Sequence, residues 1–351
     1  MSALKTRVLQ VNPTAPEPAL IQEAAKILAA GGLVAFPTET VYGLGANALD
    51  TKAVDSIFAA KGRPASDPII VHLYDLAQLP TVAINIPDLA YDLARHFWPG
   101  PLTFVLQRSS NVPANVSAGM STVAVRMPSH PVAIALLQAA NLPVAAPSAN
   151  RFARPSATTA AHVLEDLDGR IDLILDGGAA VIGVESTILD LTKEQPTILR
   201  PGGITLEILR TIIPDVEVVT KHLRADDEGI EAPGMLLKHY SPRAELLLFN
   251  GIQSALLPAM RTYALQQIEQ GRKVGLLLPD HEQSSVADLP VEIVNLGSNA
   301  SEVGHNLFSA MRLLDQASVD VIMVHGFGQT GLSLALWDRL LRAAEGHIIE
   351  V

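Results

Sequence analysis

Two positively charged side chains, Lys61 and Arg63, stand one residue apart in the segment KGRPASDP. On an extended segment such side chains face the same way and can grip phosphate oxygens, and arginine adds bidentate geometry. A nucleoside triphosphate held in this way would bring Mg²⁺ with it. The alternative is a solvated, positively charged helix end, which the helix dipole favours. The two cations therefore indicate either a phosphate site or an ordinary helix terminus.

Other polar side chains recur at the ends of apolar, strand-like segments. Hydroxyl groups satisfy ligand oxygens without adding charge. Arg126, on an otherwise apolar strand, suits a carboxylate, because burying it without an anionic partner would be costly. Such a set would serve a nucleoside triphosphate and a small zwitterion. The residues concerned are Thr38, Thr40, His72, Thr122, Arg126, Ser148, Asn150, Ser156, Ser186, Thr187 and Arg200.

Each of these side chains also has a purely structural explanation. His72 fits a hydrogen-bonded histidine of the core, and Arg126 fits an ion pair with an internal Asp or Glu. Ser148 and Ser156 stand beside prolines and fit turns. Taken together, the structural explanations are less convincing than a shared site, because a separate explanation would have to apply at each of many strand ends.

Apolar periodicity predicts the elements that would position these residues. In the first part of the chain, strands often follow one another instead of alternating with helices, which favours a mixed, twisted α/β sheet over a regular doubly wound one. Pro18, Gly31 and Asp50 supply helix start and stop signals. Helices are expected at 18–32, 51–62, 88–97, 131–140 and 158–167, and strands at 33–38, 68–73, 101–108, 121–128, 143–149, 184–191 and 197–203.

The second part of the chain is more regular. Residues 213–232 are polar, acidic and aperiodic, and they indicate a connection. Strands are then expected at 245–250, 273–279, 291–297, 319–326 and 347–351, with helices at 254–271, 301–317 and 333–344. This spacing indicates a parallel, Rossmann-like sheet. The predicted organisation is a catalytic domain at 1–212, a linker at 213–243 that acts as a lid over the site, and a smaller C-terminal domain at 244–351.

Two glycine-rich segments match nucleotide-binding fingerprints. GLGANA at 43–48 fits G-x-G-x-x-A, and GFGQTG at 326–331 fits G-x-G-x-x-G between a strand and a helix. A dinucleotide fold needs a further βαβ unit with an acid about 20 positions later, and only HIIEV remains after the last helix. We therefore predict a strand-to-helix turn at Gly326, a close backbone turn at Gly43 and Gly45, and no organic cofactor.

The composition limits the function classes. The 351-residue chain has a net charge of −11 and no cysteine. This excludes disulfides, thiol nucleophiles and cysteine-based zinc sites, and the ten histidines show no ligand spacing, so no metal site of the protein itself is expected. The negative charge argues against stable nucleic-acid binding. No apolar run is long enough to span a bilayer, so a cytoplasmic protein without a membrane partner is expected.

Seven segments resemble, in order, those of the YrdC-like family of threonylcarbamoyl-adenylate synthases. They are FPTETVYGLGANA, KGRPASDPIIVHL, WPGPLTFVL, VAVRMPSHP, APSANRFARPSATTA, ESTILDL and ILRPGGI. The later APGMLLKHYSPRAEL, followed by a Rossmann-like unit, is similar to the longer, two-domain branch. The resemblance covers essentially the whole chain. It implies a YrdC-like twisted sheet around a concave, positively lined cavity.

The resemblance also implies a reaction and its residues. L-threonine, bicarbonate and ATP become L-threonylcarbamoyl-AMP and pyrophosphate, and tRNA-modifying transferase proteins take the product to the adenosine beside the anticodon. The implied threonine site is Thr40, His72, Arg126, the backbone of Ala146, and Ser186. The implied ATP site is Lys61, Arg63, Asp67, Thr122, Ser148, Asn150, Ser156, Arg200 and Tyr240. Asp67 is a departure, since the family more often carries Asn there, and an acid cannot donate an amide hydrogen.

The implied chemistry needs positioning and not a side-chain nucleophile. The threonine amine captures CO₂ or bicarbonate, and the carbamate attacks the α-phosphate of ATP while pyrophosphate leaves. Lys61 and Arg63 are the expected catalytic residues, because cations stabilise the charge that spreads over the phosphates.

Two other functions stay open at this point. One is an RNA-binding module using the same basic cavity, against which the net charge and the lack of aromatic stacking platforms weigh. The other is a carbamoyl transferase of hydrogenase-maturation type, whose cysteine-rich zinc segments are missing here.

Overall fold

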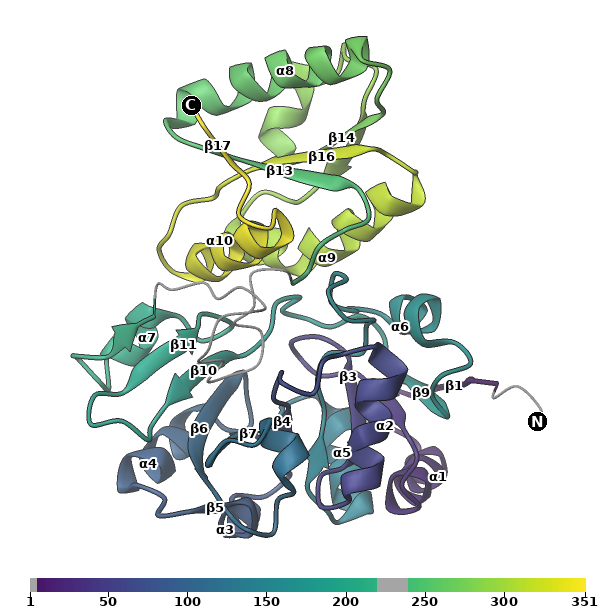
Figure 1. Ribbon diagram of the computed structural model, residues 1–351, viewed down its shortest axis with the longest axis vertical. Helices are drawn as coiled ribbons and strands as arrows, with labels where there is room; N and C mark the ends of the chain where they lie inside the picture. The colour runs from purple at the N-terminus through teal and green to yellow at the C-terminus, as the bar shows by residue number, and fades with distance from the viewer. Residues whose placement is uncertain (1–4, 220–238) are drawn as a thin grey trace. The chain divides into compact units, whose positions relative to one another are not determined.

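The computed structural model describes residues 5–219 and 239–351, which form two compact units. Residues 5–152 and 156–219 belong to unit 1, and residues 153–155 and 239–351 belong to unit 2. Each unit is built around its own sheet (Figure 1). Most of the predicted linker falls at 220–238, outside the described residues, and the lid stays a prediction.

Unit 1 contains a mixed sheet with twelve strands among the described residues. Its order is β1-β9-β2-β3-β8-β4-β7-β6-β10-β11-β12, and β5 pairs with β6 off this path. Parallel and antiparallel pairs occur together, as predicted. The strands are β1 (Arg7–Gln10), β2 (Val34–Phe36), β3 (Gly43–Asn47), β4 (Ile70–His72), β5 (Ala83–Ile84), β6 (Leu102–Arg108), β7 (Thr122–Arg126), β8 (Val144–Ala145), β9 (Leu173–Asp176), β10 (Thr187–Asp190), β11 (Thr197–Arg200) and β12 (Glu217–Val218).

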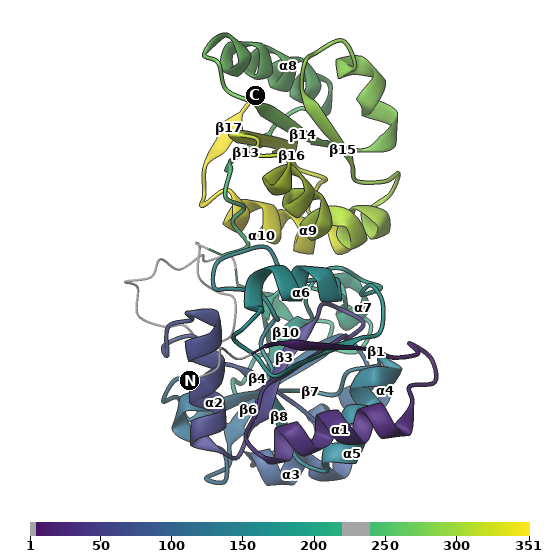
Figure 2. The same cartoon turned by 90° about the vertical axis from the view of Figure 1, so that its right-hand side faces the viewer.

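Helices cover this sheet and bury its apolar side chains. Helices α1 and α5 lie side by side (Figure 2) and share a buried cluster with β2 and β9, whereas α2, α4 and α6 contribute to a second, larger cluster. The helices are α1 (Pro18–Ala29), α2 (Thr51–Lys61), α3 (Leu79–Val82), α4 (Asp88–Phe97), α5 (Pro131–Ala140), α6 (Ala160–Leu167) and α7 (Leu206–Arg210), with 3₁₀ turns η1 (Leu76–Gln78) and η2 (Ala114–Ser117).

Helix α2 sets the positions of both predicted catalytic cations. The Asp50 carboxylate caps it by accepting from the backbone N–H groups of Lys52 and Ala53, and Gly62 ends it in the left-handed region with φ 65°. The expected helix at 51–62 is confirmed, with Lys61 as its last residue. An arrangement of Lys61 and Arg63 on one extended segment is wrong, because the chain turns at Gly62 between them. The alternative of a solvated helix end is wrong as well, because Lys61 and Arg63 are both buried.

The segment GLGAN is a strand and not the predicted turn. It forms β3, which pairs antiparallel with β2 and β8, and neither Gly43 nor Gly45 has a positive φ. A Cβ atom on Gly45 would lie 2.9 Å from both Phe36 Cε1 and Val144 Cγ1. Glycine is needed there for close packing and not for a turn.

The glycine at position 45 gives a direct test of this packing. Gly45→Ala is expected to lower the free energy of unfolding by about 1 to 3 kcal/mol, because the new methyl group overlaps two side chains. Gly43→Ala is the matched control, because its Cβ would meet its neighbours no closer than 3.4 Å. Denaturant unfolding of both variants checks the difference, and equal losses would contradict the packing argument.

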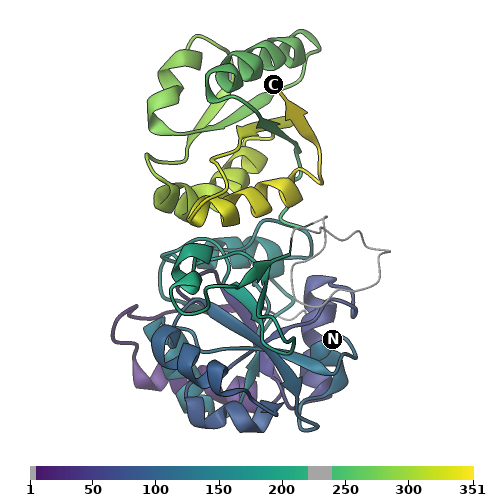
Figure 3. The same cartoon turned by 90° about the vertical axis from the view of Figure 1, so that its left-hand side faces the viewer.

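Unit 2 contains a five-stranded, wholly parallel sheet in the order β15-β14-β16-β13-β17, which confirms the predicted Rossmann-like arrangement. Helix α8 covers one face, and α9 and α10 cover the other (Figure 3). No described helix of either unit is long and apolar enough to cross a membrane. The elements are β13 (Glu245–Asn250), α8 (Gln253–Glu269), β14 (Val274–Leu278), η3 (Asp280–Val286), β15 (Glu292–Asn295), α9 (Ala300–Gln316), β16 (Val321–His325), α10 (Leu332–Ala343) and β17 (Ile348–Glu350).

Candidate active site

The sheet of unit 1 brings several predicted side chains to one edge. Strands β4 and β7 run parallel with His72 opposite Arg126, so both strands end at the same level. Strand β6 is antiparallel to β7 and places Thr103 opposite Arg126. Strand β10, parallel to β6, starts directly after Ser186 and places Thr187 opposite Leu102. Residues from four separate segments of the sequence therefore meet at this edge.

Arg126 is the centre of a buried polar network. Its Nη1 donates to Thr40 Oγ1 at 2.9 Å and its Nε donates to the Gly100 carbonyl at 3.2 Å. Its Nη2 lies 2.6 Å from Glu39 Oε1 in an ion pair. The internal acid pairing considered for Arg126 is thus present. A guanidinium has five N–H donors, so these contacts leave donors for a ligand carboxylate as well.

Thr40 is fixed before any ligand arrives. Thr38 and Thr40 share a hydrogen bond of 2.8 Å between their hydroxyl oxygens, and Thr38 donates to the Val41 carbonyl. The Glu39 carboxylate between them also accepts from the backbone N–H of Ser129 at 3.1 Å. The segment after β2 therefore holds the guanidinium and one hydroxyl together.

His72 is neutral at this edge. Burial, together with the positive charge of Arg126, lowers its pKa from 6.5 to about 3. Its Nδ1 lies 3.3 Å from the Ile70 carbonyl, and its ring meets Phe36 edge to face. A neutral imidazole can contact a bound zwitterion without repelling its ammonium group.

The lowered pKa of His72 predicts a pH-dependent stability. The unfolded chain takes up a proton near pH 6.5, whereas the folded chain does so only near pH 3, so folding loses stability as the pH falls between these values. From pH 7 to pH 5 the loss attributable to His72 is expected to be about 2 kcal/mol. Denaturant unfolding at both pH values measures it. His72→Asn should lack this component, and an equal loss in that variant would refute the assignment.

Ser186 and Arg200 form a second hydrogen-bonded group. The Ser186 hydroxyl lies 2.7 Å from the Thr103 hydroxyl oxygen. Arg200, the last residue of β11, donates from Nη2 to the Ser186 carbonyl at 3.0 Å. A buried arginine is thereby anchored beside a serine that Thr103 orients toward the Arg126 edge.

Lys61 joins α2 to the segment that follows β8. Its Nζ donates to the carbonyl oxygens of Ser148 at 2.6 Å and Asn150 at 2.5 Å. The Asn150 side chain donates to the Arg151 carbonyl at 2.7 Å. The Lys61 ammonium group therefore carries its charge at a fixed point next to two predicted ATP contacts.

Arg63 and Asp67 form a buried ion pair. Arg63 Nη2 lies 2.8 Å from Asp67 Oδ1 and donates to the Pro68 carbonyl at 2.7 Å. Both side chains are almost fully buried. Asp67 thus holds the predicted catalytic arginine in place.

The other predicted residues have different surroundings. Ser156 is fully buried and donates to Glu185 Oε1 at 2.5 Å. The Ala146 N–H donates to the Ile70 carbonyl at 2.9 Å. Thr122 begins β7, whereas Arg126 ends it, so the two lie about 13 Å apart along the strand. Tyr240 belongs to unit 2, where its ring stacks on Phe308 at 5.2 Å, and its contact with ATP stays a prediction.

Three buried residues of this site were not predicted from the sequence. Glu39 pairs with Arg126, Thr103 contacts Ser186, and Glu185 accepts from Ser156. Two of them had a signal, since Glu39 stands between the two threonines and Glu185 directly precedes Ser186. Thr103 is one threonine within an apolar strand, and only the sheet register reveals its place.

The fold is a mixed α/β sheet with buried positively charged and hydroxyl side chains near its strand ends. Two protein-family models match a chain of this kind. Residues 26–202 match the Sua5/YciO/YrdC model, described as telomere recombination, and residues 204–345 match the C-terminal domain of threonylcarbamoyl-AMP synthase. The threonylcarbamoyl-AMP synthase of Pyrococcus abyssi is 45% identical over 94% of this chain and 96% of its own length. That of Bacillus subtilis is 43% identical over 94% of each.

A solved structure agrees with these sequence matches. The crystal structure of P. abyssi Sua5 complexed with L-threonine superposes with a TM-score of 0.92 at 42% identity, over 99% of this chain and 100% of that one. The chain belongs to the threonylcarbamoyl-AMP synthase family, in its two-domain form.

Proposed function

We propose that the protein is an L-threonylcarbamoyladenylate synthase, a nucleotidyltransferase that makes L-threonylcarbamoyl-AMP and pyrophosphate from L-threonine, bicarbonate and ATP. The product serves the modification of tRNA next to the anticodon. One observation carries the proposal: Arg126, Thr40, His72 and Ser186 converge at one sheet edge in a chain of this family. The relative from P. abyssi was crystallised with L-threonine.

The threonine site follows from the chemistry of that edge. Arg126 would bind the carboxylate of threonine through its remaining N–H donors. The hydroxyl groups of Thr40 and Ser186 would contact the substrate, and the uncharged imidazole of His72 would pack against it. Glu39 balances the charge of Arg126 in the absence of substrate, so the empty site needs no external anion. The carbonyl of Ala146 would accept from the substrate.

The ATP site would be formed by the anchored cations. Lys61, Arg63 and Arg200 would face the phosphates, and Ser148, Asn150, Ser156 and Thr122 would add polar contacts. Mg²⁺ would arrive with ATP as part of the substrate, because its usual ligands in such sites include the substrate phosphates.

The reaction follows from this placement. The threonine amine adds to bicarbonate with loss of water, and the resulting carbamate oxygen attacks the α-phosphorus of ATP while pyrophosphate leaves. Holding the carbamate and the α-phosphate in line contributes up to roughly 7 to 11 kcal/mol of the barrier reduction. Fixed cations would stabilise the charge on the phosphate oxygens without reorganising.

The test is pyrophosphate release by the purified protein. With Mg²⁺-ATP present, release is expected only when L-threonine and bicarbonate are both supplied. Release without threonine, or no release under any condition, would overturn the proposal. The RNA-binding alternative would instead give tRNA retention at physiological salt with no pyrophosphate release.

A further inference from the structure

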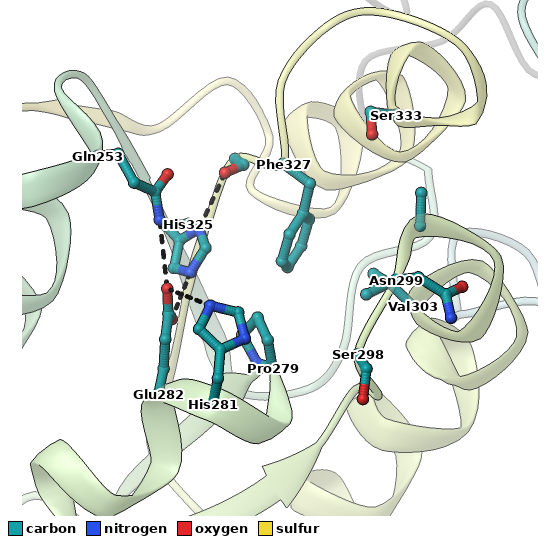
Figure 4. A pocket seen from close by; sticks show the side chains of 12 residues that line it. Gln253, Pro279, His281, Glu282, Ser298, Asn299, Val303, His325, Phe327 and Ser333 are labelled. Carbon is teal, nitrogen blue, oxygen red and sulfur yellow. Dashed lines mark hydrogen bonds and ion pairs between the residues drawn. The ribbon is translucent and has the colours of Figure 1, made fainter.

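Unit 2 contains a cavity of about 230 Å³ that the proposed reaction does not use. Its lining comes from the segments that follow the carboxyl ends of β13, β14, β15 and β16. Glu282 and His325 stand on one side, and Asn299 and Ser333 stand across from them, with Phe327 between (Figure 4). Ligands of open α/β sheets bind at this end of the strands.

The strand order makes this position a switch point. Strands β14 and β16 are neighbours in the sheet. After β14 the chain continues to β15 at one edge, and after β16 it continues to β17 at the opposite edge. The two connections diverge, and a crevice opens between them, as in nucleotide-binding sheets.

The second glycine-rich segment of the sequence lies at this crevice. Gly326 and Phe327 line the cavity, and α10 begins directly after Gly331. A Cβ on Gly326 would lie 3.0 Å from the Trp337 ring, so glycine allows close packing of α10 on the strand. At Gly328, with φ 86°, a Cβ would meet nothing within 4 Å, so a ligand can approach the backbone there. Both roles are those of glycines in nucleotide-binding turns.

An acidic residue does lie near this glycine-rich segment, although not downstream of it in the sequence. It is Glu282, which follows β14, the strand next to β16. The register of β14 and β16 pairs Leu276 with Met323, so Leu278 is level with His325. Glu282 follows four residues later, and its side chain is about nine-tenths buried. In dinucleotide folds the ribose acid also stands at the end of the strand next to the glycine-rich turn.

The Glu282 carboxylate is held in one orientation. Its Oε2 lies 2.7 Å from His325 Nε2, and its Oε1 accepts from Gln253 Nε2 at 3.2 Å. His325 Nδ1 is 2.8 Å from the Gly326 carbonyl, so both ring nitrogens face acceptors. Burial works against the charged imidazole, but the Glu282 hydrogen bond and charge raise the pKa of His325 overall. A carboxylate oxygen accepts more than one hydrogen bond, so Glu282 can also accept from a ligand hydroxyl.

We propose that this cavity binds a ribonucleoside 5′-monophosphate, with the 2′-hydroxyl of its ribose on Glu282 and its phosphate at the glycine-rich turn before α10. The volume suits one sugar and phosphate, with the base reaching into the open mouth. The charged lining residues are Glu282 and two histidines, without Lys or Arg, so a dissociation constant of about 0.1 to 1 mM is expected. The site lies within unit 2 and is independent of the proposed function.

The two tryptophans of the chain make this binding measurable in the full-length protein. Trp337 lies on α10 beside Gly326, whereas Trp98 belongs to unit 1. The protein is labelled with 5-fluorotryptophan, and Trp98→Phe assigns the two fluorine NMR signals. Titration with AMP, GMP, CMP and UMP is expected to shift the Trp337 signal to saturation for at least one of them. Binding of a nucleotide to unit 1 alone would leave that signal in place.

Matched ligands and variants then test the contacts. The 2′-deoxynucleotide, the nucleoside without phosphate, and Glu282→Gln are each expected to raise the dissociation constant by about tenfold or more. Glu292→Gln, at the exposed amino end of β15, should change it less than about twofold. A Trp337 signal that no monophosphate moves up to about 10 mM would overturn the proposal. Equal affinity for the ribo and deoxy forms in the wild-type protein would overturn it too, without relying on any variant.

Discussion

Replacing Lys61 with methionine is expected to lower the turnover of threonylcarbamoyl-AMP formation by about 100- to 1000-fold. The Lys61 side chain is buried, and two carbonyl oxygens fix its ammonium group at the predicted phosphate site. A cation fixed in this way stabilises the charge that develops on the phosphates in the transition state. Its removal should therefore act on the reaction more than on threonine binding. Steady-state pyrophosphate release at varied threonine separates kcat from KM.

Lys52→Met is the matched control for this substitution. Lys52 lies in the first turn of the same helix and is exposed, so its loss should leave turnover within about twofold. Thermal unfolding of both variants shows whether Lys61→Met is folded. An unchanged kcat with a higher KM for threonine would contradict the role of Lys61 at the phosphates.

Local signals explain why α2 and most strands were predicted correctly. Asp50 and Gly62 cap the two ends of α2 through contacts within a few residues, so the start and end of this helix can be read from the local sequence. Apolar residues lead up to His72 in IVH and, after Thr122, up to Arg126 in TVAVR, and this pattern located His72 and Arg126 at strand ends. The assignment of polar residues to strand ends needed nothing beyond such short patterns.

Long-range pairing explains what was missed. Whether Arg126 meets Glu39 depends on which strands become neighbours, and their contact spans 87 positions. Strand β3 was missed because GLGAN resembles a turn, although Phe36 and Val144 leave room there only for glycine. The acid near the second glycine-rich segment was sought downstream, whereas the sheet order brings Glu282 from the segment after β14, the strand next to β16. Each of these three misses involves a neighbour that only the folded sheet defines.

Replacing Arg126 with methionine is expected to have two separable effects. The KM for threonine should rise by about 10- to 100-fold, because a charge-assisted contact with the substrate carboxylate is lost. The free energy of unfolding should fall by about 3 to 5 kcal/mol, because Glu39 stays buried without its cation. Pyrophosphate release measures the first effect, and denaturant unfolding measures the second.

The double variant Glu39→Gln with Arg126→Met distinguishes these causes. It removes both charges, so much of the lost stability should return, whereas the KM for threonine should stay high. Arg95→Met, at an exposed position of α4, is the control for a surface arginine. If the double variant regained threonine affinity together with stability, Arg126 would be a structural partner of Glu39 alone. If the double variant regains stability but keeps a high KM for threonine, the carboxylate of the substrate binds Arg126. The loss of the guanidinium is the change that the single and the double variant have in common.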